Sequence, residues 1–423
     1  MDGCNPYIQT SSSPYFCWPV IVTPYNLPPE MCMTKPYMFL TCLIPGPSNP
    51  KASIDVYLEP LIDDLNKLRS GIWTYNVSRK QNFLMRAVLM WTINDFPACG
   101  MLSGWSTHGR LAFSHCMEHI KSFTLTYGRK SCWFDCHCRF LPIEHPFRRN
   151  NKTFRKGEVE KDGPPPKLTL SQLWRRVKDF PKVTESGVTR MNGSEEWHNW
   201  TKRNIFWDLP YWKDNLLRHN LDVMHIEKKF VDNIFNTVTN VSGKTKDNDK
   251  ARRDITLYCR RRDLELQSHS NGKLLKPKAN YTLTKDEAKI VCRWIKELRM
   301  PDGYSSNLAR CADTEKGSIH GMKSHDCHVF METLLPIAFS SLPMHVLNPL
   351  IEISHFFKDL CSTILMGDSI RRLEENIPLI LCKLERIFPP GFFDSMEHLP
   401  IHLPYEAWLG RPVQYRWMYL FER

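Results

Sequence analysis

Residues Arg86–Asp95 read RAVLMWTIND, and the chain continues from Phe96 to Cys116 as FPACGMLSGWSTHGRLAFSHC. The stretch Phe83–Thr92 is nearly all apolar, which is typical of a β-strand covered on both faces. Asp95 follows this stretch closely, and α/β sheets carry their functional side chains where strands end. We therefore expect Asp95 to belong to an active site. The alternative is an aspartate that caps the helix or turn beginning at Phe96.

The segments before this strand indicate an α/β layer fold. Tyr15–Tyr25 and Pro36–Ile44 are short, rich in β-branched and aromatic residues, and bordered by proline, so we expect two strands. Ile54–Leu68 has apolar residues at helical spacing, and Gly71 provides a stop. The order strand, strand, helix, buried strand suits an α/β fold.

The composition changes after residue 103. Cysteine, histidine and basic residues concentrate in residues 104–163, and prolines 164–166 mark a linker. Thr245–Thr284 is polar and is expected to be mobile, whereas apolar periodicity predicts five later helices: Leu221–Val238, Thr284–Met300, His325–Phe339, Val346–Met366 and Ser369–Phe388. We expect four regions, namely an α/β core (1–103), a Cys/His-rich basic insertion (104–166), its continuation (167–300) and a helical domain (301–423).

The bulk properties of the 423 residues favour a polyanionic partner. The formal net charge is +12, which suits nucleic acid, although an ordinary basic protein is the alternative. The 15 cysteines come without a secretory signal pattern, so free thiols are expected rather than disulfides. The sequence contains no run of 18 apolar residues, so a membrane span is not expected.

Several long motifs carry a family resemblance: DGCNPY from Asp2, TINDFPA, GWSTHG, FLPIEHPFRR, LDVMHIEK and PVQYRWMYLFER. Together they resemble the plant CACTA-type (En/Spm, Tnp2-like) transposases. The resemblance implies an α/β RNase H-like (DDE transposase) core that lacks its first strand and is interrupted by a large, mostly helical insertion rich in Cys, His, Arg and Lys. It also implies a nuclear protein that binds DNA at transposon terminal repeats. Self-association stays open, and neither a membrane nor a small-molecule substrate is expected.

The resemblance further implies metal-dependent DNA strand cleavage and transfer. Two Mg²⁺ or Mn²⁺ ions about 3.5–4 Å apart stabilise the attacking and leaving oxygens in such reactions, and Mg²⁺ prefers oxygen ligands. The expected ligands and catalytic residues are Asp2, Asp95 and Glu422, with Glu227 as the alternative third acid. Asp2 matches the family's first ligand, but the strand that would support it is missing.

A zinc site is a further implication of the resemblance. Family members carry Cys-x-x-Cys after the second aspartate, but Phe113 occupies the first of these positions here and leaves Cys116, with Asp222 and His225 from the later Asp-x-x-His motif. Structural zinc needs four ligands, so we expect less than one zinc per chain at this set. The insertion holds other candidates whose spacing is not that of a standard zinc knuckle and which are otherwise buried free cysteines and a histidine: Cys132, Cys136, His137 and Cys138.

Residues Arg139–Lys156 are strongly cationic, and the basic stretch Arg148–Lys156 predicts contacts with DNA phosphates. The expected contacts are Arg148, Arg149, Lys152, Arg155 and Lys156, and the cluster Arg252–Arg262 adds further charge. The alternative is a solvated charged face. Aromatic residues between these cations, such as Phe147 and Phe154, either line a nucleic-acid groove or pack in a core.

Two functions stay open at this point. One is a transposase that cleaves and transfers DNA. The other is a non-catalytic transposon remnant or a domesticated factor that binds DNA or protein. The missing first strand, the phenylalanine at position 113 and the end of the chain just after Glu422 favour the second, so we expect catalysis to be weak or lost.

Overall fold

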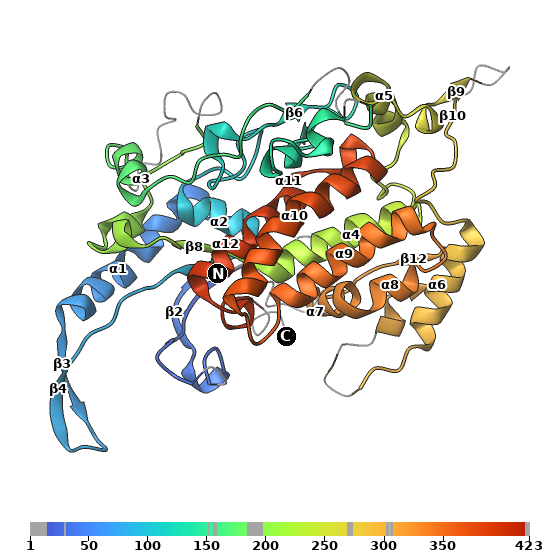
Figure 1. The fold of residues 1–423 in the computed structure, drawn as a ribbon. Coiled ribbons are helices and arrows are strands. Elements are labelled where there is room, and N and C mark those ends of the chain that lie inside the picture. Colours follow the sequence, from blue (N-terminus) through green and yellow to red (C-terminus); the bar gives the residue numbers. More distant parts are fainter. Residues whose placement is uncertain are drawn as a thin grey trace. The chain divides into compact units, whose positions relative to one another are not determined.

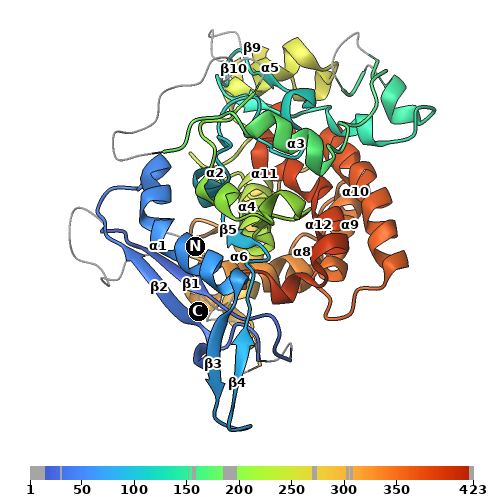
Figure 2. The ribbon, with the colours of Figure 1, turned by 90° about the vertical axis from the view of Figure 1, so that its left-hand side faces the viewer.

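The computed structural model describes residues 15–28, 31–150, 152–154, 159–183, 198–268, 274–301, 304 and 308–418. Figures 1 and 2 show the ribbon from two directions. The chain divides into two compact units. Unit 1 is built from residues 1–118 and 166–222, and unit 2 from residues 119–165 and 223–423. The segment 104–166, expected to form one insertion, is therefore shared between both units.

Unit 1 holds the longer strands of the described residues, together with short 3-10 turns. Its principal elements are β1 (Trp18–Val22), β2 (Phe39–Ile44), α1 (Ile54–Ser70), β3 (Ile72–Asn76), β4 (Gln81–Met85), β5 (Thr92–Asn94), α2 (Phe96–Ser103), α3 (Leu170–Val177) and β8 (His219–Leu221). The two predicted N-terminal strands are confirmed as the antiparallel pair β1–β2.

The predicted helix after these strands is confirmed as α1. Its apolar spacing buries Ile54, Leu58 and Ile62 on one face. Gly71 ends the helix with a φ of +110°, a conformation that favours glycine.

The expectation of one buried strand over Phe83–Thr92 is wrong. Gln81–Met85 pairs with Ile72–Asn76 as the antiparallel hairpin β3–β4, which projects from unit 1 (Figure 2), and Phe83 is 38% exposed. Only Thr92–Asn94 forms the strand β5. Only four residues separate β3 from β4, so closing this hairpin costs little entropy. The first part of the apolar stretch therefore pairs locally with β3.

Unit 2 is mainly helical. Its elements include β6 (Phe123–Thr124), β7 (Ser131–Cys132), α4 (Val223–Val238), α5 (Asp249–Tyr258), β9 (Gln267–Ser268), β10 (Leu274–Leu275), α6 (Lys285–Glu297), β11 (Ala312–Asp313), β12 (Ser318–Ile319), α7 (Ser324–Val329), α8 (Leu335–Ala338), α9 (Met344–Leu360), α10 (Gly367–Ile387), α11 (Ser395–His398) and α12 (Leu403–Gly410). A π-helical turn, Phe330–Leu334, joins α7 to α8.

The five predicted helices of this region are confirmed. At the start of α6, Thr284 and Glu287 form a complete capping box, as the sequence signal indicates. Helix α9 packs along α10 (Figure 1), and buried side chains such as Phe357 and Leu381 belong to the core of this unit.

The expectation that Thr245–Thr284 is mobile is wrong for most of its described part. Helix α5 lies inside it, and the side chains of Arg252 and Arg261 are buried. Arg252 Nη2 donates to Asp247 Oδ2 at 2.7 Å, and Arg261 Nη1 donates to the Phe388 carbonyl at 2.7 Å. These arginines organise the interior of unit 2, because buried carbonyls and carboxylates need donors.

The RNase H-like core stays a prediction. In the described ranges every sheet has two strands, and β5–β8 is the parallel pair among them. No helix of that part of the chain combines the length and apolarity that crossing a lipid bilayer requires.

Candidate active site

Two aspartates follow the paired parallel strands of unit 1. Asp95 comes directly after β5, and Asp222 comes directly after β8. Asn94 pairs with Leu221 in the register, and the backbone N–H of Asp222 donates to the Asn94 carbonyl at 3.2 Å. Because the strands are parallel, both carboxylates emerge at the same edge, where α/β sheets keep their sites.

Side-chain hydrogen bonds fix the strands that carry these aspartates. Thr92 Oγ1 lies 2.9 Å from His219 Nδ1, and Asn94 Nδ2 donates to Thr92 Oγ1 at 2.7 Å. Burial, with Arg218 and Lys202 nearby, lowers the pKa of His219 to about 3, so its ring is neutral at pH 7. The edge is therefore held by an uncharged, partly buried polar network.

Asp95 has a structural role as well. It is the N-cap of α2, and its Oδ1 accepts a 2.7 Å hydrogen bond from the backbone N–H of Ala98. The alternative role expected from the sequence is thus real. It does not exclude a metal, because a carboxylate has two oxygens and about four lone-pair positions.

Asp222 is the functional candidate that the sequence analysis assigned to a different site. Its side chain is only 2% exposed. The signal that could have found it is the repeat of one pattern, since HNL-Asp222 resembles TIN-Asp95 as a short strand followed by an aspartate. The paired strands bring these two residues to one edge.

The expected zinc set divides between the two units. Cys116 and Asp222 belong to unit 1 and His225 to unit 2, so this ligand set stays a prediction. Phe113 is 1% exposed, and its ring lies 5.9 Å from that of Phe96. At this position the chain contributes to the apolar core of unit 1.

The other acidic residues expected at the active site are Asp2, Glu422 and the alternative Glu227. Asp2 and Glu422 lie outside the described residues. Glu227, on α4 of unit 2, is fully buried, and its Oε2 lies 2.7 Å from His328 Nδ1. Burial lowers the pKa of His328, but the Glu227 carboxylate outweighs this and raises it to about 9. Glu227 thus forms a buried ion pair, and its role as a third acid stays a prediction.

The predicted phosphate contacts differ in exposure. Arg148 is 4% exposed, and its guanidinium donates to the carbonyls of Leu141, Arg139 and Asp162 at 3.0, 2.7 and 2.9 Å. It therefore does not fit a phosphate contact, because the insertion's own carbonyls occupy its donors. Arg149 is exposed and pairs with Glu144 at 2.5 Å.

Three further cations belong to the predicted set of phosphate contacts. Lys152 is exposed, whereas Arg155 and Lys156 lie outside the described residues. The aromatic residues beside them pack together, since the rings of Phe147 and Phe154 lie 5.9 Å apart. Phe154 is 3% exposed, so the core alternative holds for this ring, whereas Phe147 is half-buried.

Comparison with known families gives two matches. Residues 1–180 match the model described as transposase family tnp2, and residues 360–423 match a domain of unknown function, DUF4218. Residues 1–180 belong to the tnp2 transposase family. No curated protein and no solved structure matches the chain.

The tnp2 segment contains β5, Asp95 and α2, and hence one half of the aspartate pair. Asp222 and Glu227 lie between the two matched segments. The tnp2 match covers four of the motifs that carry the resemblance, from DGCNPY to FLPIEHPFRR.

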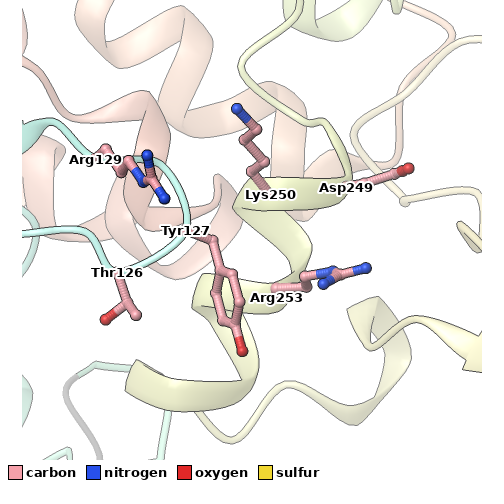
Figure 3. Close-up of a pocket in the computed structure, with 6 residues that line it drawn as sticks. All are labelled: Thr126, Tyr127, Arg129, Asp249, Lys250 and Arg253. Carbon is pink, nitrogen blue, oxygen red and sulfur yellow. The ribbon is translucent and has the colours of Figure 1, made fainter.

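A basic hollow in unit 2 provides exposed cations, of which Arg253 belongs to the predicted cluster Arg252–Arg262, whereas Arg129 and Lys250 were not predicted. Figure 3 shows Arg129 from the loop after β6 near Lys250 and Arg253 of α5, with Tyr127 and the acidic Asp249 completing the rim. The Arg253 guanidinium carbon lies 5.6 Å from the centre of the Tyr127 ring. Cations beside an aromatic ring are a common setting for nucleic-acid backbones and bases.

Proposed function

We propose that this transposase-derived protein cleaves and transfers DNA strands with Mg²⁺ or Mn²⁺, as CACTA-type elements require. The observation that carries the proposal is the placement of Asp95, which lies inside the tnp2 segment, and Asp222 at one edge of the parallel pair β5–β8. Asp2 and Glu422 are proposed as further ligands. The proposed setting is the nucleus, with transposon terminal repeats as the DNA.

The donor set of this edge fits a hard cation. Its side-chain donors are oxygens, which Mg²⁺ prefers. Asn94 Oδ1, next to Asp95, is buried without a hydrogen-bond partner in the part of the chain that the structure describes. When bound, such ions stabilise charge on the attacking and leaving oxygens of an in-line displacement at phosphorus. The protein contributes by holding the carboxylates of Asp95 and Asp222 rigidly at this edge.

Binding of the DNA backbone needs cations that neutralise phosphate charge. The family supports DNA binding in general, and Arg129, Lys250 and Arg253 supply exposed charge in unit 2. We propose this basic hollow, together with Arg149 and Lys152, as phosphate contacts. Arg148 is left out, because its donors serve backbone carbonyls.

The test is divalent-metal-dependent nicking of terminal-repeat DNA by the purified chain, compared with Asp95→Asn. Asparagine caps helices about as well as aspartate, so this variant keeps α2 but loses the charge. Losing a ligand that supplies several kcal/mol should slow nicking by roughly 100-fold or more. Asp64→Asn, an exposed aspartate of α1, is the matched control and should nick at the wild-type rate.

The second candidate is a non-catalytic factor that binds DNA or a protein partner. It is favoured by the structural roles that both aspartates already have, since Asp95 caps α2 and Asp222 is buried in unit 1. DNA binding without metal-dependent nicking in the wild-type chain would select it. Nicking that Asp95→Asn leaves unchanged would instead show that the proposed ligands are wrong.

A further inference from the structure

Three potential metal ligands converge inside unit 2. Cys136 precedes the 3-10 turn His137–Phe140, and His398 ends α11. His137 Nε2 lies 3.3 Å from His398 Nδ1, and Cys136 Sγ lies 3.5 Å from the same nitrogen. All three side chains are buried, with 0–1% of their surface exposed.

These separations are those of a tetrahedral zinc site. Zinc binds imidazole nitrogen at about 2.0–2.1 Å and thiolate sulfur at about 2.3 Å. Tetrahedral angles then place two nitrogens about 3.3–3.4 Å apart, and nitrogen and sulfur about 3.5–3.6 Å apart. We propose that Cys136, His137 and His398 supply three ligands of a buried zinc ion, whose fourth tetrahedral position is taken by a water molecule.

A buried carboxylate orients one of the ligands. Glu385 of α10 is fully buried, and its Oε1 lies 2.7 Å from Nδ1 of His137. A proton on Nδ1 shared with the carboxylate leaves a lone pair on Nε2, the nitrogen that lies near His398. Metal-bound histidines commonly use their second nitrogen in this way, and the carboxylate strengthens the ligand.

A hydrogen-bond network alone explains the cluster less well. His398 Nδ1 faces both His137 Nε2 and Cys136 Sγ. A neutral ring nitrogen has either one proton or one lone pair, so it makes one good hydrogen bond in the ring plane. An ion between the three atoms satisfies all three lone pairs at once.

Three neighbouring residues, His402, Cys138 and Cys382, are not among the proposed zinc ligands. His402 Nε2 lies 3.3 Å from Nε2 of His398, on the other side of that ring. Cys138 and Cys382 lie with their sulfurs 3.5 Å apart and form a separate group with Glu385. A site built on that pair would have two thiolates, whereas the proposed site has one.

Such an ion would join distant parts of the chain within unit 2. Cys136 and His398 are 262 residues apart, and His398 lies in the DUF4218 segment. Because the ligands come together only in the fold, the free energy of metal binding adds to the free energy of folding. The ion would therefore hold residues 119–165 against the C-terminal helices of the same unit.

The experiment measures metal content and coordination in the full chain purified with zinc, and again after exchange with Co²⁺. We expect about one zinc per chain that resists dialysis. X-ray absorption should find one sulfur, two imidazole nitrogens and one further oxygen, and cobalt should give tetrahedral visible bands with a single-thiolate charge-transfer band. Cys136→Ser should lose this band. Glu385→Gln should keep the ligands but weaken affinity about 10- to 100-fold.

Two cysteine variants separate the proposed set from its competitors. Cys382→Ser removes a neighbouring thiol and should leave the cobalt spectrum unchanged. Cys116→Ser tests the ligand set expected from the family resemblance and should also leave it unchanged. A wild-type chain that binds neither metal, or that shows two sulfurs at the ion, overturns the proposal. So does metal loss in Cys116→Ser or Cys382→Ser with retention in Cys136→Ser. If Cys136→Ser fails to fold, the sulfur count of the wild-type chain decides.

Discussion

At the residue scale, one buried ion pair should control the pH dependence of unit 2. The folded pKa of His328 is about 9, against an ordinary 6.5, so its contribution to stability is complete below pH 6.5 and is lost as the pH rises toward 9. Burial raises the pKa of Glu332 to about 7, which has the same sign between pH 4.5 and 7. The loss from His328 should be on the order of 3 kcal/mol.

We therefore predict that the free energy of unfolding of unit 2 falls between pH 6.5 and 9. Urea denaturation at several pH values measures it, and His328→Gln should flatten this part of the curve. His355→Gln, an exposed histidine on α9, is the control and should keep the wild-type slope. A wild-type slope in His328→Gln would mean that another group causes the pH dependence.

At the element scale, α1 depends on a buried ion pair at its first turn. Lys202 Nζ lies 2.6 Å from Asp55 Oδ1 and donates to the Ala52 carbonyl at 2.9 Å. Burial raises the pKa of Asp55 to about 6, although Lys202 opposes the shift. Removing the lysine leaves a carboxylate without its partner in a dry environment.

We predict that Lys202→Met destabilises unit 1 by about 3–5 kcal/mol, because breaking a buried ion pair leaves the other charge buried without compensation. The double variant Lys202→Met/Asp55→Leu should recover most of this loss, since a buried pair can be exchanged for apolar side chains at little cost. Chemical denaturation measures both. The exposed pair of Lys67 and Asp64 on the same helix supplies the control, and Lys67→Met should change stability by less than about 1 kcal/mol.

At the scale of the whole molecule, the net charge of +12 should govern DNA affinity. Each neutralised phosphate contributes about 0.9 to the slope of log affinity against log salt. We predict that replacing Arg129, Lys250 and Arg253 by glutamine weakens binding at low salt and lowers this slope by about 2–3, if each contacts one phosphate. Fluorescence anisotropy with a labelled duplex at several salt concentrations measures both quantities.

A second triple variant with the same change in charge separates local contact from general attraction. Lys358, Arg371 and Arg372 are exposed on α9 and α10, away from the basic hollow in sequence, and their replacement by glutamine should change the slope less. Equal slopes in the two triple variants would show that the basic hollow has no special role. Binding that salt does not weaken would count against phosphate contacts altogether.

The sequence by itself determined the local elements and the family. Apolar spacing and the Thr284 capping signal predicted the helices of unit 2, because a helix's period and its cap depend on residues within a few positions of one another. The long motifs indicated a Tnp2-like transposase, and the match over residues 1–180 confirms this. Asp95 could be singled out because its strand and its carboxylate are adjacent in the chain.

Only the tertiary structure decided which residues meet. It paired β5 with β8 and so put Asp222 beside Asp95, and it buried Arg148 among carbonyls. It also brought Cys136 to His398 across 262 residues. Parallel strand pairing and ligand convergence depend on contacts between distant segments, which no local period encodes. The apolar stretch Phe83–Thr92 shows the same limit, because its partly exposed hairpin was decided by a competition between local pairing and burial.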